Sequence, residues 1–455
     1  MAAMGLDRRR VLWGVLVAAC AGSLAVSVGI ARQQVIVGSV EGGWTYGFLQ
    51  PASWAIVAVW LATASVAIAW LVVTDGRPWR WWPRLVAWFL LALLLQGALR
   101  ALTPFTLEQM FVSEGANGFY SVARRYYPIT VLSEFMTVRA DWPLHAQSNM
   151  PGKLMLVYAL KSVSHEPDVL AWLAIAVSNL GGLLIYRFTR DLLDDARAAE
   201  WSAVLYFLVP GKLYFFPLLN TVTPVAVLTC ACLLLRWLRT GRAGYAMGLG
   251  VALYALVFYE PLPLVIGLLF AALMALAVSQ GGLSGGLVAR HATYSVAAFA
   301  ITYVFIRLQF GFDLVSAFRE IGSHATTFNH IAGRPYGVWV RQNLWDFAFG
   351  TGVAQSIVAI PTIVLGLVES RGRLFASPTA LLGLSLLAVL GAVDLIGVNR
   401  GEVVRLWIFL SCFFQIPTAI LCSRLESRAA MACVLLTTLL QAALGTAMIG
   451  FILPG

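Results

Sequence analysis

The 455-residue chain is 60% hydrophobic and only 11% charged, with a mean hydropathy of +0.82. Soluble globular domains contain about 25% charged residues, so this composition excludes a soluble protein and indicates an integral membrane protein. The formal net charge of +10 comes without a basic tail, which favours contact with anionic lipid head groups or lipid phosphates over nucleic acid.

The six cysteines all lie within apolar runs. They are Cys20, Cys230, Cys232, Cys412, Cys422 and Cys433. Their spacing matches neither a metal site nor a disulfide framework, so we interpret them as small core residues. No other spacing in the chain indicates a metal or an organic cofactor, and a divalent metal is kept only as an alternative.

The chain begins with a basic segment that is followed by an apolar run at about residues 11–31. A cleaved signal peptide is one interpretation. The apolar run is longer than the roughly 7 to 15 residues usual for such a peptide, which favours an uncleaved first helix. Arg8, Arg9 and Arg10 stand directly before the run and predict a cytoplasmic amino terminus under the positive-inside rule.

Further runs that are apolar enough to span a membrane follow along the chain. They lie at about residues 52–74, 84–103, 167–187, 200–218, 222–238, 244–259, 261–279, 292–310, 350–368, 377–397, 403–422 and 430–452. Together with the first run they make thirteen. The pattern predicts an all-α polytopic membrane protein that forms a single domain over residues 1–455.

Arginines recur in every second connection between these runs. They are Arg77, Arg80, Arg84, Arg187, Arg190, Arg197, Arg236, Arg239, Arg242, Arg290, Arg371, Arg373, Arg424 and Arg428. All of them fall on the cytoplasmic side if the runs alternate, which places the carboxyl terminus outside. The alternation requires that residues 151–164 do not cross. A helix of that length reaches only about 20 Å against a hydrocarbon core of about 30 Å, so we expect a re-entrant or surface-lying helix there.

Two long polar connections fall on the extracytoplasmic side. The first, at residues 104–151, combines carboxylates, basic groups, a histidine and many aromatic residues, and the second covers residues 311–349. The cytoplasmic connections are short by contrast. Acids, cations and aromatics at a membrane surface are what an enzyme acting on a charged lipid needs, so we expect the catalytic site on the extracytoplasmic face.

Four short motifs carry a resemblance to a known family. Glu114 lies in SEGANGFY, His145 and Lys153 lie in LHAQSNMPGKL, and later motifs read GRPYGVWVRQNLWDFAFG and NRGEVVRLW. In layout and in these motifs the chain resembles the GT-C superfamily of membrane glycosyltransferases, which includes bacterial cell-envelope mannosyl- and arabinosyltransferases. The resemblance implies a polyprenyl-phosphate-linked sugar donor and an acidic residue in a large outer loop. The acidic loop here follows the third apolar run instead of the first, and Glu114 has no second carboxylate beside it.

Transfer of a sugar to a hydroxyl group requires a base that takes the hydroxyl proton. A carboxylate near the membrane surface, with a pKa tuned by desolvation, can be that base. Glu114 is the first candidate because it stands between an apolar approach and the turn-prone GANG, and Glu108 is the second. The alternative is that either glutamate is simply solvated.

The remaining candidates are substrate-binding residues. Guanidinium and ammonium groups would meet the lipid phosphate, and polar or aromatic groups would hold the sugars. They are His145, Lys153, Asn220, Arg334, Tyr336, Arg341, Arg400, Glu402 and Arg405. Glu260, at the outer end of an apolar run, is a minor candidate for bonding sugar hydroxyls. The competing interpretations are an ion-paired helix start for Arg400, Glu402 and Arg405, ordinary loop charges for the other basic residues, and an interfacial aromatic belt for Tyr336.

These observations predict a membrane glycosyltransferase in a bacterial plasma membrane. It would transfer a sugar from a polyprenyl-phosphate carrier to an envelope glycan, a glycolipid or a protein. The sequence identifies neither the sugar nor the acceptor. One alternative is a lipid or sugar transporter or flippase, although the chain shows no two halves of matching hydropathy. The other is a ligase or polymerase of lipid-linked glycans.

Overall fold

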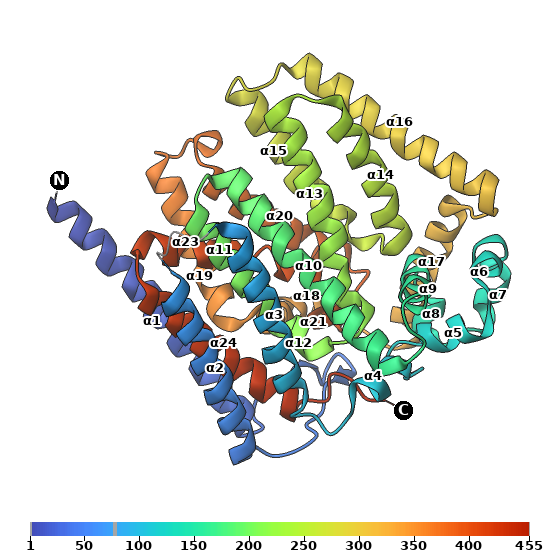
Figure 1. Ribbon diagram of the computed structural model, residues 1–455, viewed down its shortest axis with the longest axis horizontal. Helices are drawn as coiled ribbons and strands as arrows, with labels where there is room; N and C mark the ends of the chain where they lie inside the picture. The colour runs from blue at the N-terminus through green and yellow to red at the C-terminus, as the bar shows by residue number, and fades with distance from the viewer. Residues whose placement is uncertain (1, 76–79, 455) are drawn as a thin grey trace.

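The computed structural model describes residues 2–75 and 80–454, which are almost entirely helical (Figure 1). Ten helices in this part of the chain are long and apolar enough to cross a membrane. They are α1 (Ala2–Ala31), α2 (Trp54–Thr74), α3 (Trp81–Arg100), α10 (Pro167–Leu193), α13 (Thr223–Thr240, preceded by η2, Leu219–Val222), α15 (Gly267–Ser279, preceded by η3, Leu262–Ile266), α16 (Gly285–Phe310), α20 (Pro378–Ile396), α23 (Gln415–Leu425, preceded by α22, Ile408–Ser411) and α24 (Arg428–Met448). The predicted all-α polytopic fold is therefore confirmed.

The number of spans differs from the predicted thirteen in three places. The run at 350–368 belongs to a bent pair, α18 (Tyr336–Thr351) and α19 (Val353–Glu369), whose axes meet at 103°, and counting it as one span gives eleven. The run at 200–218 is divided into α11 (Ala196–Phe207) and α12 (Pro210–Phe215), because Pro210 starts a new helix and cannot continue the old one. The run at 244–259 forms α14 (Ala243–Tyr259), whose 17 residues make it shorter than any of the ten spans.

The predicted short helix is present as α9 (Gly152–Lys161). Its 10 residues reach about 15 Å, which is too short to cross a bilayer. The long loop before it contains α4 (Leu107–Val112), α5 (Phe119–Arg125), α6 (Pro128–Ser133), α7 (Phe135–Val138), η1 (Arg139–Asp141) and α8 (Leu144–Gln147). The remaining elements are α17 (Leu314–Ile331), η4 (Leu374–Ala376), α21 (Val403–Leu406) and a small antiparallel pair, β1 (Gly38–Ser39) with β2 (Trp44–Thr45).

Arginine-bearing turns meet at one end of the helix bundle, which we call the arginine face. Arg197 and Arg428 both contact the carboxylate of Asp75, at 3.2 and 2.7 Å. Arg84 contacts Glu200 at 3.0 Å in the same way. Turns that were predicted to share one side of the membrane are thus in contact with each other. The predicted cytoplasmic Arg77 lies outside the described residues.

The long loop folds around a hydrophobic core of its own, separate from the main core of the bundle. Phe111, Phe135 and Trp142 are buried in it together with Leu154 of α9. Residues of α10, α14 and α17 complete this core. Figure 1 shows α5–α9 gathered beside α17 at one end of the molecule. The loop is therefore a packed unit that holds its polar residues in fixed positions.

Candidate functional site

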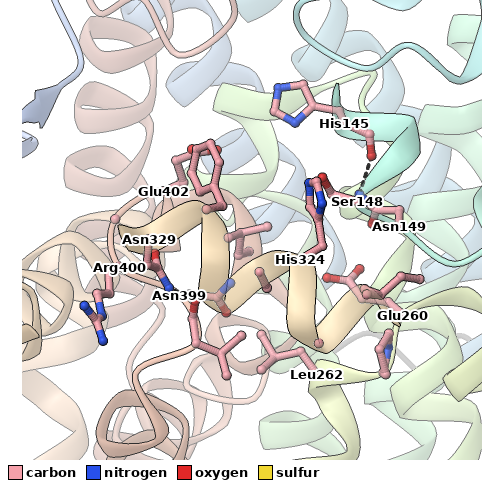
Figure 2. Close-up of a pocket in the computed structure, with 18 of the residues that line it drawn as sticks. His145, Ser148, Asn149, Glu260, Leu262, His324, Asn329, Asn399, Arg400 and Glu402 are labelled. Carbon is pink, nitrogen blue, oxygen red and sulfur yellow. Dashed lines mark hydrogen bonds between the residues drawn. The ribbon is translucent and has the colours of Figure 1, made fainter. Parts of the chain in front are cut away.

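A cavity of about 300 Å³ lies between α8, the turn after α14, α17 and the segment that leads into α21 (Figure 2). Its apolar lining includes Leu144, Leu262, Phe318, Ile321 and Phe328. Its polar lining includes His145, Asn149, Glu260, His324, Asn329, Arg334, Asn399, Arg400, Glu402 and Arg405. Five of the predicted binding residues, separated by up to 260 positions in the chain, thus line one cavity.

Glu402 is held between two guanidinium groups. Its Oε1 accepts a hydrogen bond from Nη2 of Arg334 at 3.2 Å, and its Oε2 accepts one from Arg405. Burial alone would raise the pKa of Glu402, but the charges of Arg405 and Arg334 outweigh it and hold the pKa below its usual value. Both carboxylate oxygens are occupied, so Glu402 fixes the two arginines.

Arg334 is almost completely buried and is enclosed by aromatic rings. Its guanidinium carbon lies 5.3 Å from the ring centre of Trp44, 5.0 Å from that of Phe328 and 5.9 Å from that of Trp339. Its Nη1 also donates to the carbonyl of Arg400 at 2.7 Å. These contacts leave the side chain one orientation.

Arg400 lines the cavity, but its charged group points elsewhere. Figure 2 shows its guanidinium directed away from His145 and His324. The guanidinium lies 5.4 Å from the ring centre of Tyr336, and its Nη1 donates to the carbonyl of Arg334 at 2.8 Å. Arg400 and Tyr336 thus brace the turn that carries Arg334.

A second ion pair lies on the other side of the cavity. Nζ of Lys153, which is fully buried, contacts Oε2 of Glu260 at 3.0 Å. The hydroxyl of Thr223 donates to the same Oε2 at 2.5 Å, and Nζ of Lys153 also donates to Oδ1 of Asn149 at 2.8 Å. Lys153 therefore reaches the cavity only through Glu260 and Asn149, instead of facing a ligand directly as predicted.

Two histidines and one arginine of the cavity have unusual nitrogen atoms: the pKa of His145 is lowered, and one nitrogen each of Arg405 and His324 lacks a hydrogen-bond partner among the described residues. Burial, reinforced by the charge of Arg405, lowers the pKa of His145 to about 4, so its imidazole is neutral at pH 7. Nε of Arg405 and Nε2 of His324 are buried and have no hydrogen-bond partner within the described residues. Most buried polar atoms in folded proteins are paired, and these two belong to residues that line the cavity.

The predicted catalytic residues lie outside the cavity lining. Glu114 is half exposed and contacts Arg125 at 3.2 Å, although the backbone of the next residue, Gly115, hydrogen-bonds His145. The carbonyl of Ala116 lies 3.5 Å from Nη1 of Arg405. Glu108 is exposed in the first turn of α4. Their catalytic role stays a prediction.

Two predicted binding residues also lie elsewhere. Arg341 is exposed on α18 and donates to the carbonyl of Gly337 at 3.3 Å, within its own helix. Asn220 lies in η2, outside the cavity lining.

Sequence reasoning missed His324, and it gave Glu260 little weight. The signals were a histidine on a helix with one apolar face and a glutamate directly after an apolar run, in FYEPLP.

Across residues 2–75 and 80–454, no group of three or more His, Cys, Asp or Glu side chains has the arrangement of a metal site. The cavity instead combines basic side chains, two carboxylates and two histidines with an apolar wall. Such a lining can bind a molecule that has an anionic head and an apolar tail.

No protein-family model and no curated protein matches the sequence. Among solved structures, the archaeal oligosaccharyltransferase AglB from Archaeoglobus fulgidus, in complex with an inhibitory peptide and a dolichol-phosphate, is similar with a TM-score of 0.45 and 13% sequence identity. The similarity covers 80% of this chain and 56% of that enzyme, so the chain spans little more than half of its length. A likeness at this level says nothing about activity or substrate.

Proposed function

We propose that this protein is a membrane glycosyltransferase of the GT-C type, which transfers a sugar from a polyprenyl-phosphate-linked donor to an envelope glycan, a glycolipid or a protein. The observation that carries the proposal is Arg405, whose buried Nε has no protein partner in the described structure although it lines a cavity with an apolar wall. An unsatisfied buried guanidinium nitrogen is costly unless a ligand completes it.

The charges on this side of the cavity suit a lipid phosphodiester. Arg334 and Arg405 contribute two positive charges and Glu402 one negative charge, which leaves one positive charge in excess. A sugar linked to a lipid through one phosphate is a phosphodiester with a single negative charge. Guanidinium groups bind phosphate oxygens through charge-assisted hydrogen bonds. The donor phosphate would therefore complete the hydrogen bonding of Arg405.

The apolar side of the cavity suits the lipid tail. Helix α17 buries Leu314 and Ile321 but leaves Val315, Phe318 and Ile331 exposed. Such a helix is suited to the boundary between head groups and acyl chains. A tail that enters beside Phe318 would reach the cavity from the membrane without crossing the polar side.

The orientation of the protein follows in this proposal from its arginines. The arginine face would lie in the cytoplasm, as the positive-inside rule requires, and the cavity would open on the extracytoplasmic side of a bacterial plasma membrane. The loops at 104–151 and 311–349 would then be the extracytoplasmic parts that shape the site. Labelling of single cysteines placed in these loops, in intact cells, tests this orientation.

Turnover in nanodiscs tests the activity. Purified protein is given radiolabelled polyprenyl-phospho-hexoses and polyprenyl-phospho-pentoses together with an envelope extract as acceptor. We expect release of polyprenyl phosphate and transfer of label to the acceptor with at least one donor. Movement of labelled lipid between leaflets without covalent change would instead assign a flippase.

A further inference from the structure

Glu260 differs from the other carboxylate of the cavity in how its two oxygens are used. Its Oε2 accepts from both Lys153 and Thr223, at 3.0 and 2.5 Å. Its Oε1 has no hydrogen-bond partner among the residues that the structure describes, although the residue lines the cavity. Figure 2 shows the carboxylate on the side of Glu260 that faces His324 and Asn149.

We propose that Glu260 is the catalytic base, and that its Oε1 takes the proton of the acceptor hydroxyl. This assignment rests on the proposed glycosyltransferase function. Under this proposal the base is Glu260, which lies outside the long loop, and Glu114 no longer has that role.

The reaction balances with the groups present. The acceptor oxygen forms a bond to the anomeric carbon, and the bond between that carbon and the phosphate oxygen breaks. The phosphate leaves with the electron pair of the broken bond, and the hydroxyl proton moves to Oε1 of Glu260. The products are the new glycoside, polyprenyl phosphate and a protonated Glu260, which then returns its proton to solvent or to the departing phosphate.

The positions of the charged groups agree with one side of the cavity holding the base and another holding the phosphate. The cavity is lined by Glu260 at one side and by the cluster of Arg334, Glu402 and Arg405 at another, and Figure 2 shows Glu260 and Glu402 on opposite sides of His324. In a single displacement that inverts the anomeric centre, the acceptor with its base and the leaving group lie on opposite sides of the sugar that is transferred. A sugar held between them would present its anomeric carbon to an acceptor beside Glu260.

The other carboxylates fit the role less well. Both oxygens of Glu402 are bound by guanidinium groups, which hold its charge in place and make it a poor proton acceptor. Glu114 is half exposed to solvent and is already paired with Arg125. Glu260 alone among these three combines burial with a free oxygen in the cavity.

Lys153 and Thr223 act as positioning residues in this scheme. Burial lowers the pKa of Lys153, but the adjacent charge of Glu260 opposes that effect and favours the ion pair. The ammonium also lies 5.8 Å from the ring centre of Tyr259, which precedes Glu260 in the chain. Because both positioning groups bind Oε2, they orient Oε1 toward the cavity.

The decisive measurement compares turnover and lipid binding in Glu260→Gln. We expect release of polyprenyl phosphate to fall at least about 100-fold, since general base catalysis contributes roughly that much or more. Binding of a fluorescent polyprenyl phosphate should stay within about twofold, because the phosphate side of the cavity is unchanged. Glu260→Asp should keep more turnover than Glu260→Gln, because it retains a carboxylate.

Glu260→Gln leaves the charge of Lys153 buried without a counter-charge, so the variant risks misfolding. The double variant Lys153→Met with Glu260→Gln removes both charges together, and its thermal unfolding reports whether the fold is intact. The same loss of turnover is expected in it. The exposed Glu134→Gln is the control from the long loop and should turn over like the wild type.

Three results would overturn the assignment. One is a folded Glu260→Gln or double variant that keeps more than about a tenth of wild-type turnover. Another is loss of turnover in Glu114→Gln with retention in Glu260→Gln, which would return the role of base to Glu114. The third is a wild-type protein that releases polyprenyl phosphate from no donor, which would remove the proposed function itself and this assignment with it.

Discussion

The two polar regions of the molecule use the same residue types in different ways. At the arginine face the exposure of the guanidinium groups varies, from 15% accessible to solvent for Arg84 to 47% for Arg428 and 49% for Arg8. At the cavity the corresponding groups are buried, with Arg334 8% and Lys153 0% accessible. Exposed ion pairs contribute little to stability, whereas buried charges must be fully paired or bind something. In the proposed function, the charges of the arginine face would orient the protein and those of the cavity would bind substrate.

The carboxylates of the two regions show the same contrast. At the arginine face Glu369 is bound by both Arg8 and Arg424 and is 29% accessible to solvent. At the cavity Glu402 is bound by both Arg334 and Arg405 and is 18% accessible. Removing a charge should consequently have larger effects at the cavity than at the arginine face.

Replacing the central carboxylate of the cavity should have the largest effect. Glu402→Gln leaves Arg334 and Arg405 buried without their counter-charge, and breaking a buried pair in this way costs about 3 kcal/mol or more. Chemical unfolding in detergent measures the loss. The matched variant at the arginine face, Glu369→Gln, should cost less than about 1 kcal/mol. Equal losses would contradict the distinction between the two regions.

Removing the guanidinium of Arg405, whose Nε has no partner among the described residues, should reduce activity more than stability. In the proposed function, Arg405→Gln would delete a charge-assisted contact with the donor phosphate worth about 1.5–3 kcal/mol, which corresponds to a loss of about 10- to 100-fold in kcat/KM. Steady-state turnover in nanodiscs measures it. Arg424→Gln is the control and should leave kcat/KM within about twofold. Wild-type kinetics in Arg405→Gln would remove Arg405 from the phosphate site.

Acidification should destabilise the protein through His145. Its folded-state pKa of about 4 lies below the usual value of about 6.5, so the unfolded chain binds the proton first as pH falls. The stability from this group is complete above pH 6.5 and is lost as pH falls toward 4. Glu402, whose pKa is also lowered, adds a further loss at more acidic pH.

Thermal unfolding between pH 7 and pH 4 measures this dependence. His145→Gln should lower the melting temperature at pH 7 only slightly and should reduce the decline between pH 6.5 and 4. The neighbouring charges of Arg405 and Lys153 remain in the variant. An unchanged slope would mean that another group carries the proton uptake.

The smallest effect is expected at the arginine face. Arg428→Gln removes one of the two arginines bound to Asp75 and leaves Arg197 in place. Because Arg428 is nearly half exposed, the free energy of unfolding should change by less than about 1 kcal/mol. Turnover should equal that of the wild type, and a change greater than threefold would show that the two regions are coupled.

The sequence predicted the fold well because hydropathy alone determines which segments can cross a membrane. It overcounted spans where a proline divided an apolar run, at Pro210, and where a glycine allows a sharp bend, at Gly352, whose φ is 103°. Hydropathy averages over a window and does not register a break of this kind. The predicted run at 350–368 corresponds to α19, whereas most of α18 falls in residues 311–349, which were predicted to be a polar connection.

The candidate site was predicted in part. Arg334, Glu402 and Arg405 were singled out as candidate substrate-binding residues, and the structure brings them together. The pairing of Lys153 with Glu260 joins residues more than 100 positions apart, so spacing along the chain gave no sign of it. The proposal of Glu260 in place of Glu114 rests in part on exposure to solvent, which a single sequence does not report for residues in loops.

The aromatic enclosure of Arg334 has a kinetic consequence. Ordering a long, flexible side chain on binding costs about 0.5–1.5 kcal/mol. Trp44, Phe328 and Trp339 have already restricted this arginine during folding. In the proposed function, a lipid phosphate would therefore bind an arginine whose orientation is already fixed. The entropy saved in this way should appear as a longer residence time of the lipid.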